Sequence, residues 1–322
     1  MNDRRRLTPR KALSGVAADV SSFVRGVDYD YRVDVAADPL AYPLAFDRML
    51  EADPALFDPL DDEGVPVKGA VGQGGRYMPS RIAGYGLAQW NLARRTGSAE
   101  AMSRFLAAAD WFARQPDGAF MHDLVLEGMA CPWPSCLAQG EGLSVLVRAF
   151  VATGEPRYLD QARGALGLFS VPVEAGGVAS TLPDGSYFVE EYPGGRHLHV
   201  LNGALFAVVG LDDLARLSGA SEPKAVLLRD RLLASLDRNI GLWSSGDWSV
   251  YSVERAALGA RNACTLHYQL VHVALLGHLA NAPAHRPCLS RQTDRWARGP
   301  HSAATRVRAL GMKAFYRFTN GW

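Results

Sequence analysis

The chain has 322 residues, with 34 Lys and Arg against 33 Asp and Glu, and it contains four cysteines. This balance excludes a global field that would attract nucleic acid, so an anionic substrate must be held by local cations. Four cysteines in a chain of this length do not make a disulfide framework. Cys131 and Cys136 are spaced more widely than a zinc knuckle requires, so we interpret all four as reduced thiols.

The N-terminus is basic, but no apolar segment follows it, so the sequence shows no signal peptide. The longest apolar stretch, residues 200–211, includes Asn202 and is too short to cross a bilayer. We therefore expect a cytoplasmic protein without a membrane span. Nucleic acid is not an expected partner, because no basic stripe with interleaved aromatic residues is present.

Residues 1–75 are rich in Asp and Pro, and Asp-Pro pairs start turns rather than helices. We expect an irregular N-terminal arm here that wraps a larger body, with one short helix near residues 44–51. We expect residues 76–322 to form the main domain, which would be the catalytic one if the protein is an enzyme.

Three junctions in residues 76–322 share one pattern, in which a helix ends at a glycine and the next helix opens at a capping residue or a proline. The glycines are Gly97, Gly154 and Gly219, and the openings are Ser98, Glu155-Pro156 and Ser221-Glu222-Pro223. A fourth, weaker junction starts at Leu275. Gly-rich extended segments separate the pairs, and residues 183–185 are typical of a hairpin turn. The sequence predicts a mainly α fold, an α/α toroid of antiparallel helix pairs with β-hairpins at the rim.

Two short clusters carry residues suited to sugar chemistry. Glu190, Glu191 and Tyr192 precede a proline, where they form either a solvated acidic strand end or part of an active site. Trp243 and Trp248 lie near Tyr251, where they either stack on pyranose rings or fill the protein core.

A third cluster, residues 267–272, opens a helix on which Tyr268 and His272 share a face. His197 and His199 share a strand face and would be the one pair to suggest a metal. No metal-binding spacing accompanies them, and residues 72–75 lack the ending of a phosphate loop. We expect neither a metal nor an organic cofactor.

An ordered series of five stretches resembles the D-glucuronyl C5-epimerase family, whose members convert D-glucuronate to L-iduronate within heparan-type chains. The clearest are Ala-Gln-Gly-x-Gly at residues 138–142 and Glu-Glu-Tyr-Pro at residues 190–193. The full series is residues 61–67, 76–87, 138–149, 190–193 with 200–203 and 210–214, and 268–272.

The resemblance implies an α/α barrel and a cofactor-independent epimerase that acts on an acidic glycan such as heparosan. A homodimer is compatible with the resemblance to this family. The catalytic residues carried over are Glu191, Tyr192, Tyr251 and Tyr268. The expected substrate-binding residues are Arg76, Tyr77, Gln139, Arg196, Asn202, Trp248, Arg255, Arg261 and His272, with Arg196, Arg255 and Arg261 as candidates to pair the sugar carboxylate.

The chain departs from the family pattern at two places. Glu254 stands where the family has an arginine, which moves the basic side chain to Arg255, and residues 269–271 replace a His-Thr-Thr run. Three alternatives stay open: a uronate lyase, a glycoside hydrolase that uses paired carboxylates, and an inactive protein that binds acidic glycans.

Overall fold

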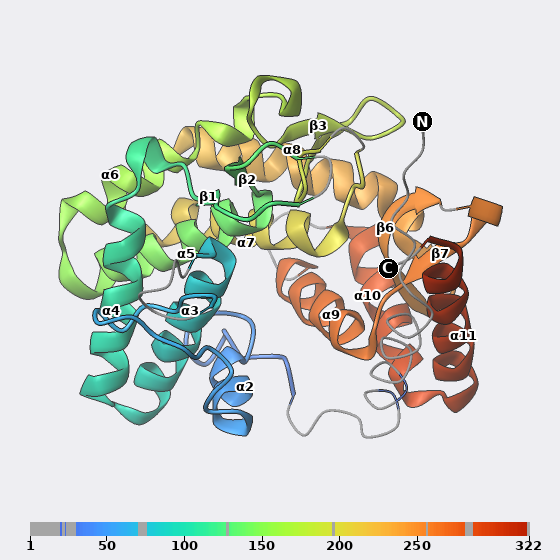
Figure 1. The fold of residues 1–322 in the computed structure, drawn as a ribbon, viewed down its shortest axis with the longest axis horizontal. Helices are drawn as coiled ribbons and strands as arrows, with labels where there is room; N and C mark the ends of the chain where they lie inside the picture. Colours follow the sequence, from blue (N-terminus) through green and yellow to red (C-terminus); the bar gives the residue numbers. More distant parts are fainter. Residues whose placement is uncertain are drawn as a thin grey trace. The chain divides into compact units, whose positions relative to one another are not determined.

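The computed structural model describes residues 30–69, 76–126, 129–194, 197–255, 257–280 and 286–320, together with Val20 and Phe23. The described part of the chain is mainly helical, with a few short antiparallel strands (Figure 1). Contacts between residues divide the chain into two compact units. We call Tyr29–His197 with Gly203–Ser235 the large unit, and Met1–Asp28 with Leu198–Asn202 and Leu236–Trp322 the small unit.

The large unit holds most of the helices. They are α2 (Phe46–Ala52), α3 (Pro79–Thr96), α4 (Ala99–Ala113), α5 (Cys136–Thr153) and α6 (Pro156–Ala165), with α7 (Leu201–Leu217) and α8 (Pro223–Asn239) lying mainly in this unit. Helix α3 packs on α4, and α5 packs on α6. The short helix expected near residues 44–51 is α2. The division at residue 75 stays a proposal.

The predicted helix ends are confirmed. Gly97 and Gly154 follow α3 and α5 with φ of 72° and 73°, in the left-handed region where glycine carries no steric penalty. The Ser98 hydroxyl accepts a hydrogen bond from the Ala101 amide at 3.2 Å, which caps α4. Pro156 and Pro223 are the first residues of α6 and α8.

The strands of the large unit form two small hairpins. β1 (Met121–His122) pairs with β2 (Trp133–Pro134), and β3 (Ala179–Thr181) pairs with β4 (Tyr187–Val189). The turn between β3 and β4 contains Gly185 at φ 79°, as the sequence predicts. Short 3-10 helices at Pro116–Gly118, Leu168–Ser170 and Val173–Ala175 complete this unit.

The small unit combines a three-stranded antiparallel sheet with three helices. The sheet order is β5 (Ser244–Ser245), β6 (Trp248–Arg255) and β7 (Arg261–Ala263). The helices are α9 (Leu266–Ala280), α10 (Pro287–Arg298) and α11 (Ala303–Asn320), of which α10 packs on α9 and α11 packs on β7. Short 3-10 helices lie at Ile240–Trp243, Ala257–Gly259 and Gly299–His301. No helix within the described ranges has the length and apolarity needed to cross a bilayer.

A buried ion pair ties three segments of the large unit together. Arg148 of α5 and Asp213 of α7 are almost completely buried, and Arg148 Nη1 lies 2.5 Å from Asp213 Oδ2. The Ser144 hydroxyl donates to the same carboxylate oxygen at 2.7 Å. The guanidinium also donates to the carbonyl oxygens of Leu40 and Ala41, at 3.0 and 3.2 Å. The segment before α2 is therefore held on α5 by the same side chain that joins α5 to α7.

Helices α5 and α7 touch through backbone atoms. A Cβ built on Gly140 would overlap Phe206 and Ala207 of α7, and one built on Gly210 would overlap the Gly140 carbonyl. No residue larger than glycine fits either position without moving a helix. This contact places the N-terminal turn of α5 beside the first turn of α7.

We expect Gly210→Ala to lower the free energy of unfolding by about 1–3 kcal/mol, since the added methyl group has backbone rather than a movable side chain to displace. The matched control is Gly277→Ala, also within a helix, where the nearest atom to the new Cβ is Thr293 Cγ2 at 3.9 Å. That variant should gain about 0.5–1 kcal/mol, because alanine favours helix. Urea titrations of both measure this, and equal stabilities would contradict the close contact.

Candidate active site

The predicted catalytic residues fall in both units, and each group is described within its own unit. In the large unit, Glu190, Glu191 and Tyr192 follow strand β4. The Glu190 amide donates to the Val178 carbonyl at 2.8 Å, and its own carbonyl accepts from the Cys136 amide at 3.0 Å. That amide is one of those left unpaired at the start of α5, so the turn after β4 is anchored on the helix end.

Glu190 and Glu191 are both buried, but their surroundings differ. Glu190 Oε1 accepts a hydrogen bond from the Ser180 hydroxyl at 2.8 Å and lies 3.5 Å from His197 Nδ1. These partners hold Glu190 within the hairpin that presents it. A structural role for Glu190 agrees with the expectation that Glu191 is the reactive acid of the pair.

The Glu191 side chain packs against the first turn of α7 and the start of α5. A Cβ on Gly203 would lie 2.7 Å from Glu191 Cβ, 2.9 Å from its Oε2 and 3.1 Å from Cys136 Sγ. Glycine at position 203 therefore makes room for the Glu191 carboxylate. Burial and the adjacent Glu191 and Glu190 carboxylates raise the pKa of the Cys136 thiol well above its usual range, so Cys136 stays a neutral thiol.

Tyr192 is half-buried and begins an aromatic row. Its ring centroid lies 5.9 Å from that of Trp133, which in turn stacks on His122 at 4.4 Å. Burial lowers the pKa of His122 to about 4, so this imidazole is neutral near pH 7. Sequence reasoning missed Trp133 and His122. The one available signal was a tryptophan in the C-x4-C segment, just before the Ala-Gln-Gly-x-Gly motif.

Two expected substrate-binding residues of the large unit are on its surface. Tyr77 is exposed and donates a hydrogen bond to Asp61 Oδ2 at 2.7 Å, which raises its pKa to about 12. Arg76 is exposed and donates weakly to the Asp123 carbonyl, at 3.4 Å. Both remain predictions as substrate contacts.

Gln139 has a structural role. Its side chain is fully buried and holds the loop after α4: Oε1 accepts from the Phe120 amide at 2.7 Å, and Nε2 donates to the Gly118 carbonyl at 2.9 Å. Its contact with substrate stays a prediction.

In the small unit, Tyr251 of β6 and Tyr268 of α9 meet. Their ring centroids lie 5.1 Å apart at 63°, an edge-to-face contact, and His267 meets Tyr268 at 5.2 Å. Both tyrosines are only partly buried. Burial lowers the pKa of His267, which therefore favours the neutral imidazole beside the phenols. The structure thus brings together two phenols that lie 17 positions apart in the sequence.

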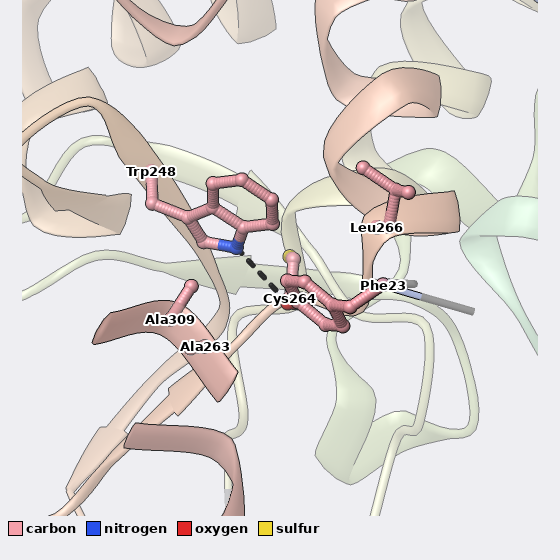
Figure 2. Close-up of a cluster of buried hydrophobic side chains, with 6 residues drawn as sticks. All are labelled: Phe23, Trp248, Ala263, Cys264, Leu266 and Ala309. Carbon is pink, nitrogen blue, oxygen red and sulfur yellow. Dashed lines mark hydrogen bonds between the residues drawn. The ribbon is translucent and has the colours of Figure 1, made fainter. Parts of the chain in front are cut away.

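The tyrosine pair lies on a small apolar core. Its buried members are Phe23, Trp248, Ala263, Cys264, Leu266 and Ala309, and Figure 2 shows the Trp248 indole over this group. Trp248 stacks on Phe23 at 5.5 Å and donates from Nε1 to the Cys264 carbonyl at 3.0 Å. Trp248 is completely buried, which favours the alternative of a core tryptophan, and its sugar contact stays a prediction.

His272 and Gln269 of α9 attach this helix to β6. Gln269 Oε1 accepts from the Ser249 amide at 2.8 Å and its hydroxyl at 2.7 Å, and Nε2 donates to the Trp296 carbonyl at 2.9 Å. His272 Nδ1 lies 2.9 Å from Ser249 Oγ, and burial lowers the pKa of His272 to about 3. Because the Ser249 proton goes to Gln269, we assign the His272 proton to Nδ1. His272 is fully buried, and its contact with substrate stays a prediction.

Four predicted substrate-binding residues remain, namely Asn202, Arg261, Arg196 and Arg255. Asn202 is buried, so its side chain does not reach solvent. The Arg261 guanidinium donates to the carbonyl oxygens of Ser244 and Leu242, at 2.6 and 2.5 Å, which makes it a brace for the start of β5. The substrate contacts of both residues stay predictions. Arg196 and the side chain of Arg255 lie outside the described residues.

The part of the chain that the structure describes contains no group of three or more His, Cys, Asp or Glu side chains placed to hold a metal ion. All four cysteines are free thiols, as expected from the sequence. Sequence reasoning also missed a cation of the small unit. Lys313 of α11 donates from Nζ to Asn262 Oδ1 of β7 at 2.7 Å, and its charge acts on the buried Cys264 thiol.

Similarity to known proteins identifies the family of this chain. The profile of the family described as D-glucuronyl C5-epimerase C-terminus matches residues 118–298. The chain belongs to this family. The matched residues include the turn after β4, Tyr251, Tyr268 and the glycines at which α5 and α7 touch.

Two related proteins match this chain over part of their length. The D-glucuronyl C5-epimerase of Caenorhabditis elegans is 32% identical over 211 residues, which are 60% of this chain and 34% of the relative. An uncharacterized protein of Methanocaldococcus jannaschii is 34% identical over 143 residues, 44% of each chain. The match therefore spans about a third of the animal enzyme and less than half of the archaeal protein.

Solved structures with similar folds are much more distant in sequence. Cellobiose 2-epimerase from Spirochaeta thermophila has a TM-score of 0.51 at 11% identity, covering 96% of this chain and 98% of that one. A glycoside hydrolase of family 105 from C. acetobutylicum has a TM-score of 0.52 at 10% identity, covering 96% and 91%. A polysaccharide lyase has a TM-score of 0.51 at 11% identity, covering 96% and 97%. These likenesses identify the α/α-toroid fold that the sequence predicts.

The depressed pKa of the buried His122 predicts how the free energy of unfolding changes at acid pH. An imidazole with a depressed pKa binds fewer protons in the folded than in the unfolded protein, so stability falls as pH drops from 6.5 toward 4. We expect His122→Phe, which keeps a ring against Trp133, to reduce this loss by up to about 3 kcal/mol at pH 4.

The measurement is urea unfolding of both proteins between pH 4 and pH 8. His272 is unchanged in both, so its contribution cancels. Replacement of the exposed His301 by Asn is the control and should leave the pH dependence as it is. An identical acid loss in the parent protein and His122→Phe would refute the assignment.

Proposed function

We propose that this protein is a uronate C5-epimerase that inverts C5 of glucuronate residues in an acidic glycan, by removal of a proton from one face and its return to the other. The observation that carries the proposal is the edge-to-face pair of Tyr251 and Tyr268, two half-buried phenols in segments that match the family.

The chemistry explains why phenols suit this role. The C5 hydrogen is adjacent to a carboxylate, and its removal develops further negative charge on that group as an enediolate forms. One group must accept the proton, and a second must supply one from the opposite face. A phenol can do either, provided that its surroundings bring its pKa toward the working pH.

Glu191 and Tyr192 are assigned to the same reaction through the family resemblance. Glu191 is buried and lies next to Gly203 and Cys136. We assign Glu191 and Tyr192 as catalytic together with Tyr251 and Tyr268.

A cation must neutralise the sugar carboxylate. Arg261 is occupied with backbone carbonyls, so we propose Arg255, Arg196 and Arg76 for this task, with Lys313 as an additional candidate. Neither a metal nor an organic cofactor is part of the proposal. Cytoplasmic location and assembly as a homodimer also stay proposals.

A uronate lyase is the second candidate. It would begin with the same proton abstraction and then expel the substituent at O4, leaving a double bond that absorbs ultraviolet light. The chemistry of the first step is shared, so the residues alone do not separate the two. Product analysis does: an epimerase gives a mixture of C5 configurations in intact chains.

We expect Tyr268→Phe and Tyr251→Phe each to lower the rate of C5 exchange by about 10²–10⁴-fold, because each change removes a hydroxyl that moves a proton. The assay is incubation with uronate-containing oligosaccharides in D₂O, with and without EDTA, read by NMR for deuterium at C5. Both variants should fold, since both rings keep their edge-to-face contact.

Thermal melts of each tyrosine variant are the control. Exchange by Tyr268→Phe at the parent rate would remove Tyr268 from the mechanism. A variant that exchanges deuterium without changing configuration would identify the group that delivers the proton to the opposite face.

The two glutamates provide a matched comparison in the same assay. Glu191→Gln should slow exchange about as strongly as the tyrosine variants, because the amide cannot accept the proton. Glu190→Gln should cost far less activity, since Glu190 is engaged with Ser180 and His197. The reverse order of effects would show that Glu190 is the reactive acid.

A further inference from the structure

Helix α11 of the small unit carries apolar side chains on two faces. One face packs on β7, and its buried members are Ala309 and Tyr316 (Figure 1). On the other face, Val307, Phe315 and Phe318 are 70%, 48% and 62% exposed. These positions follow one another at helical spacing, so their side chains form a single stripe, which we call the α11 stripe. Packing within the small unit accounts for the first face and leaves the second in contact with solvent.

A further exposed apolar residue lies close to α11. Leu258 belongs to the 3-10 helix Ala257–Gly259, which contacts α11, and its side chain is 85% exposed. Its φ is 61°, in the left-handed region that a bulky side chain adopts only at a steric cost. An aliphatic side chain held in water at this cost favours a surface that binds a partner.

The helix that carries the α11 stripe is strongly basic and contains no aspartate or glutamate. Its cations are Arg306, Arg308, Lys313 and Arg317. Residues 286–320 together hold eight Lys and Arg against one acid, Asp294, although the whole chain is balanced at 34 against 33. Positive charge is therefore concentrated at the end of the chain that forms α10 and α11.

The arginines of α11 lie on both sides of the α11 stripe. Arg306 and Arg317 follow the helix along one side, and the exposed Arg308 lies on the other. The Arg308 guanidinium donates to the Ser245 carbonyl at 2.7 Å, and this neutral partner leaves its positive charge in place. An apolar stripe between basic side chains is typical of helices that lie in the interfacial region of a membrane.

We propose that the α11 stripe, together with Leu258, binds the surface of a membrane that contains anionic lipids. The stripe enters the boundary between headgroups and acyl chains, and the arginines of α11 lie at the level of the lipid phosphates, with their aliphatic stems along the apolar layer. The helix lies along the surface and does not span the bilayer. This surface goes beyond the proposed function and does not depend on it.

The charge of α11 argues against a second copy of this chain as the occupant. A symmetric dimer through the α11 stripe would bring the cations of one α11 against the same cations of the other, and like charges weaken association. A soluble acidic glycan would match the cations but not the aliphatic side chains of Val307 and Leu258. An anionic lipid surface complements both the charge and the apolar stripe.

Vesicle sedimentation tests the proposal with the full chain. The vesicles consist of phosphatidylcholine with or without phosphatidylglycerol, and the bound fraction is measured after centrifugation. We expect the protein to bind the anionic vesicles at least about tenfold more tightly than the neutral ones, and to bind more weakly as salt screens the lipid charge. Equal binding to both kinds of vesicle, or binding to neither, would overturn the proposal.

The double variant Phe315→Ser with Phe318→Ser removes two apolar anchors and keeps every cation. Its affinity for the anionic vesicles should fall by about tenfold or more. Because both side chains are exposed, its thermal melt should match that of the parent. The control is Leu227→Ser, which replaces a leucine of α8 that is 58% exposed and should bind as the parent does. Unchanged binding by the double variant, or an equal loss in the control, contradicts the role of the stripe.

Leu258→Gly provides a variant outside the helix. Glycine adopts the left-handed conformation without penalty, so stability should not fall, whereas vesicle binding should weaken. Parental binding by this variant would remove Leu258 from the surface.

The role of charge is tested with Arg306→Gln, which should lower the affinity for anionic vesicles about fivefold and reduce its salt dependence. Arg104→Gln, at a partly exposed arginine of α4, is its control and should change neither. Equal effects of the two substitutions would contradict a local role of α11.

Two measurements identify the other occupants. In sedimentation velocity, a dimer that the double phenylalanine variant converts to a monomer, without vesicle binding, would overturn the proposal in favour of a contact between copies. Binding of the parent to soluble heparosan that the same variant loses, again without vesicle binding, would overturn it in favour of a glycan site.

Activity separates this proposal from the proposed function. With soluble oligosaccharides, the double phenylalanine variant should exchange deuterium at the parent rate, because the α11 stripe is not part of the proposed site. No exchange by the parent, combined with the expected vesicle binding, refutes the epimerase assignment and leaves the lipid surface standing. Exchange by the parent without vesicle binding refutes the lipid surface and leaves the epimerase.

Discussion

The buried pair of Arg148 and Asp213 is the constraint on which the large unit depends. Removing two charges from water is costly, and the interaction offsets this cost only if the remaining donors and acceptors are satisfied. Here Ser144, Arg216 and the carbonyls of Leu40 and Ala41 satisfy them. The pair therefore fixes α5, α7 and the segment before α2 in one arrangement, because any other would leave a buried charge without partners.

The α5–α7 contact then determines where acids gather. Glycines at positions 140 and 210 let the helices touch, and Gly203 opens a space in which the Glu191 carboxylate lies against Cys136. Glu190 and Glu191 are both buried in this region, with Glu190 held by the Ser180 hydroxyl. Helix packing therefore decides where the proposed base lies.

Local signals in the sequence predicted the fold well. Gly97, Gly154 and Pro156 mark helix ends because the left-handed conformation and the proline ring are properties of single residues. The solvent exposure of a side chain, in contrast, is not a property of a single residue. Gln139, Trp248 and His272 have side chains suited to binding sugars, yet their positions are decided by partners distant in the sequence, which no local pattern reports.

The motifs that carry the family resemblance therefore contain both residues that hold the structure together and residues that are proposed to react. In the small unit, Gln269 and His272 fasten α9 to Ser249 of β6, and this attachment brings Tyr268 against Tyr251. Gln269 stands at one of the positions where the chain departs from its family. It makes three hydrogen bonds inside the protein, so the side chain at this position helps to hold α9 on β6 beside the tyrosine pair. The departure therefore lies in the support of the two phenols and not in the phenols themselves.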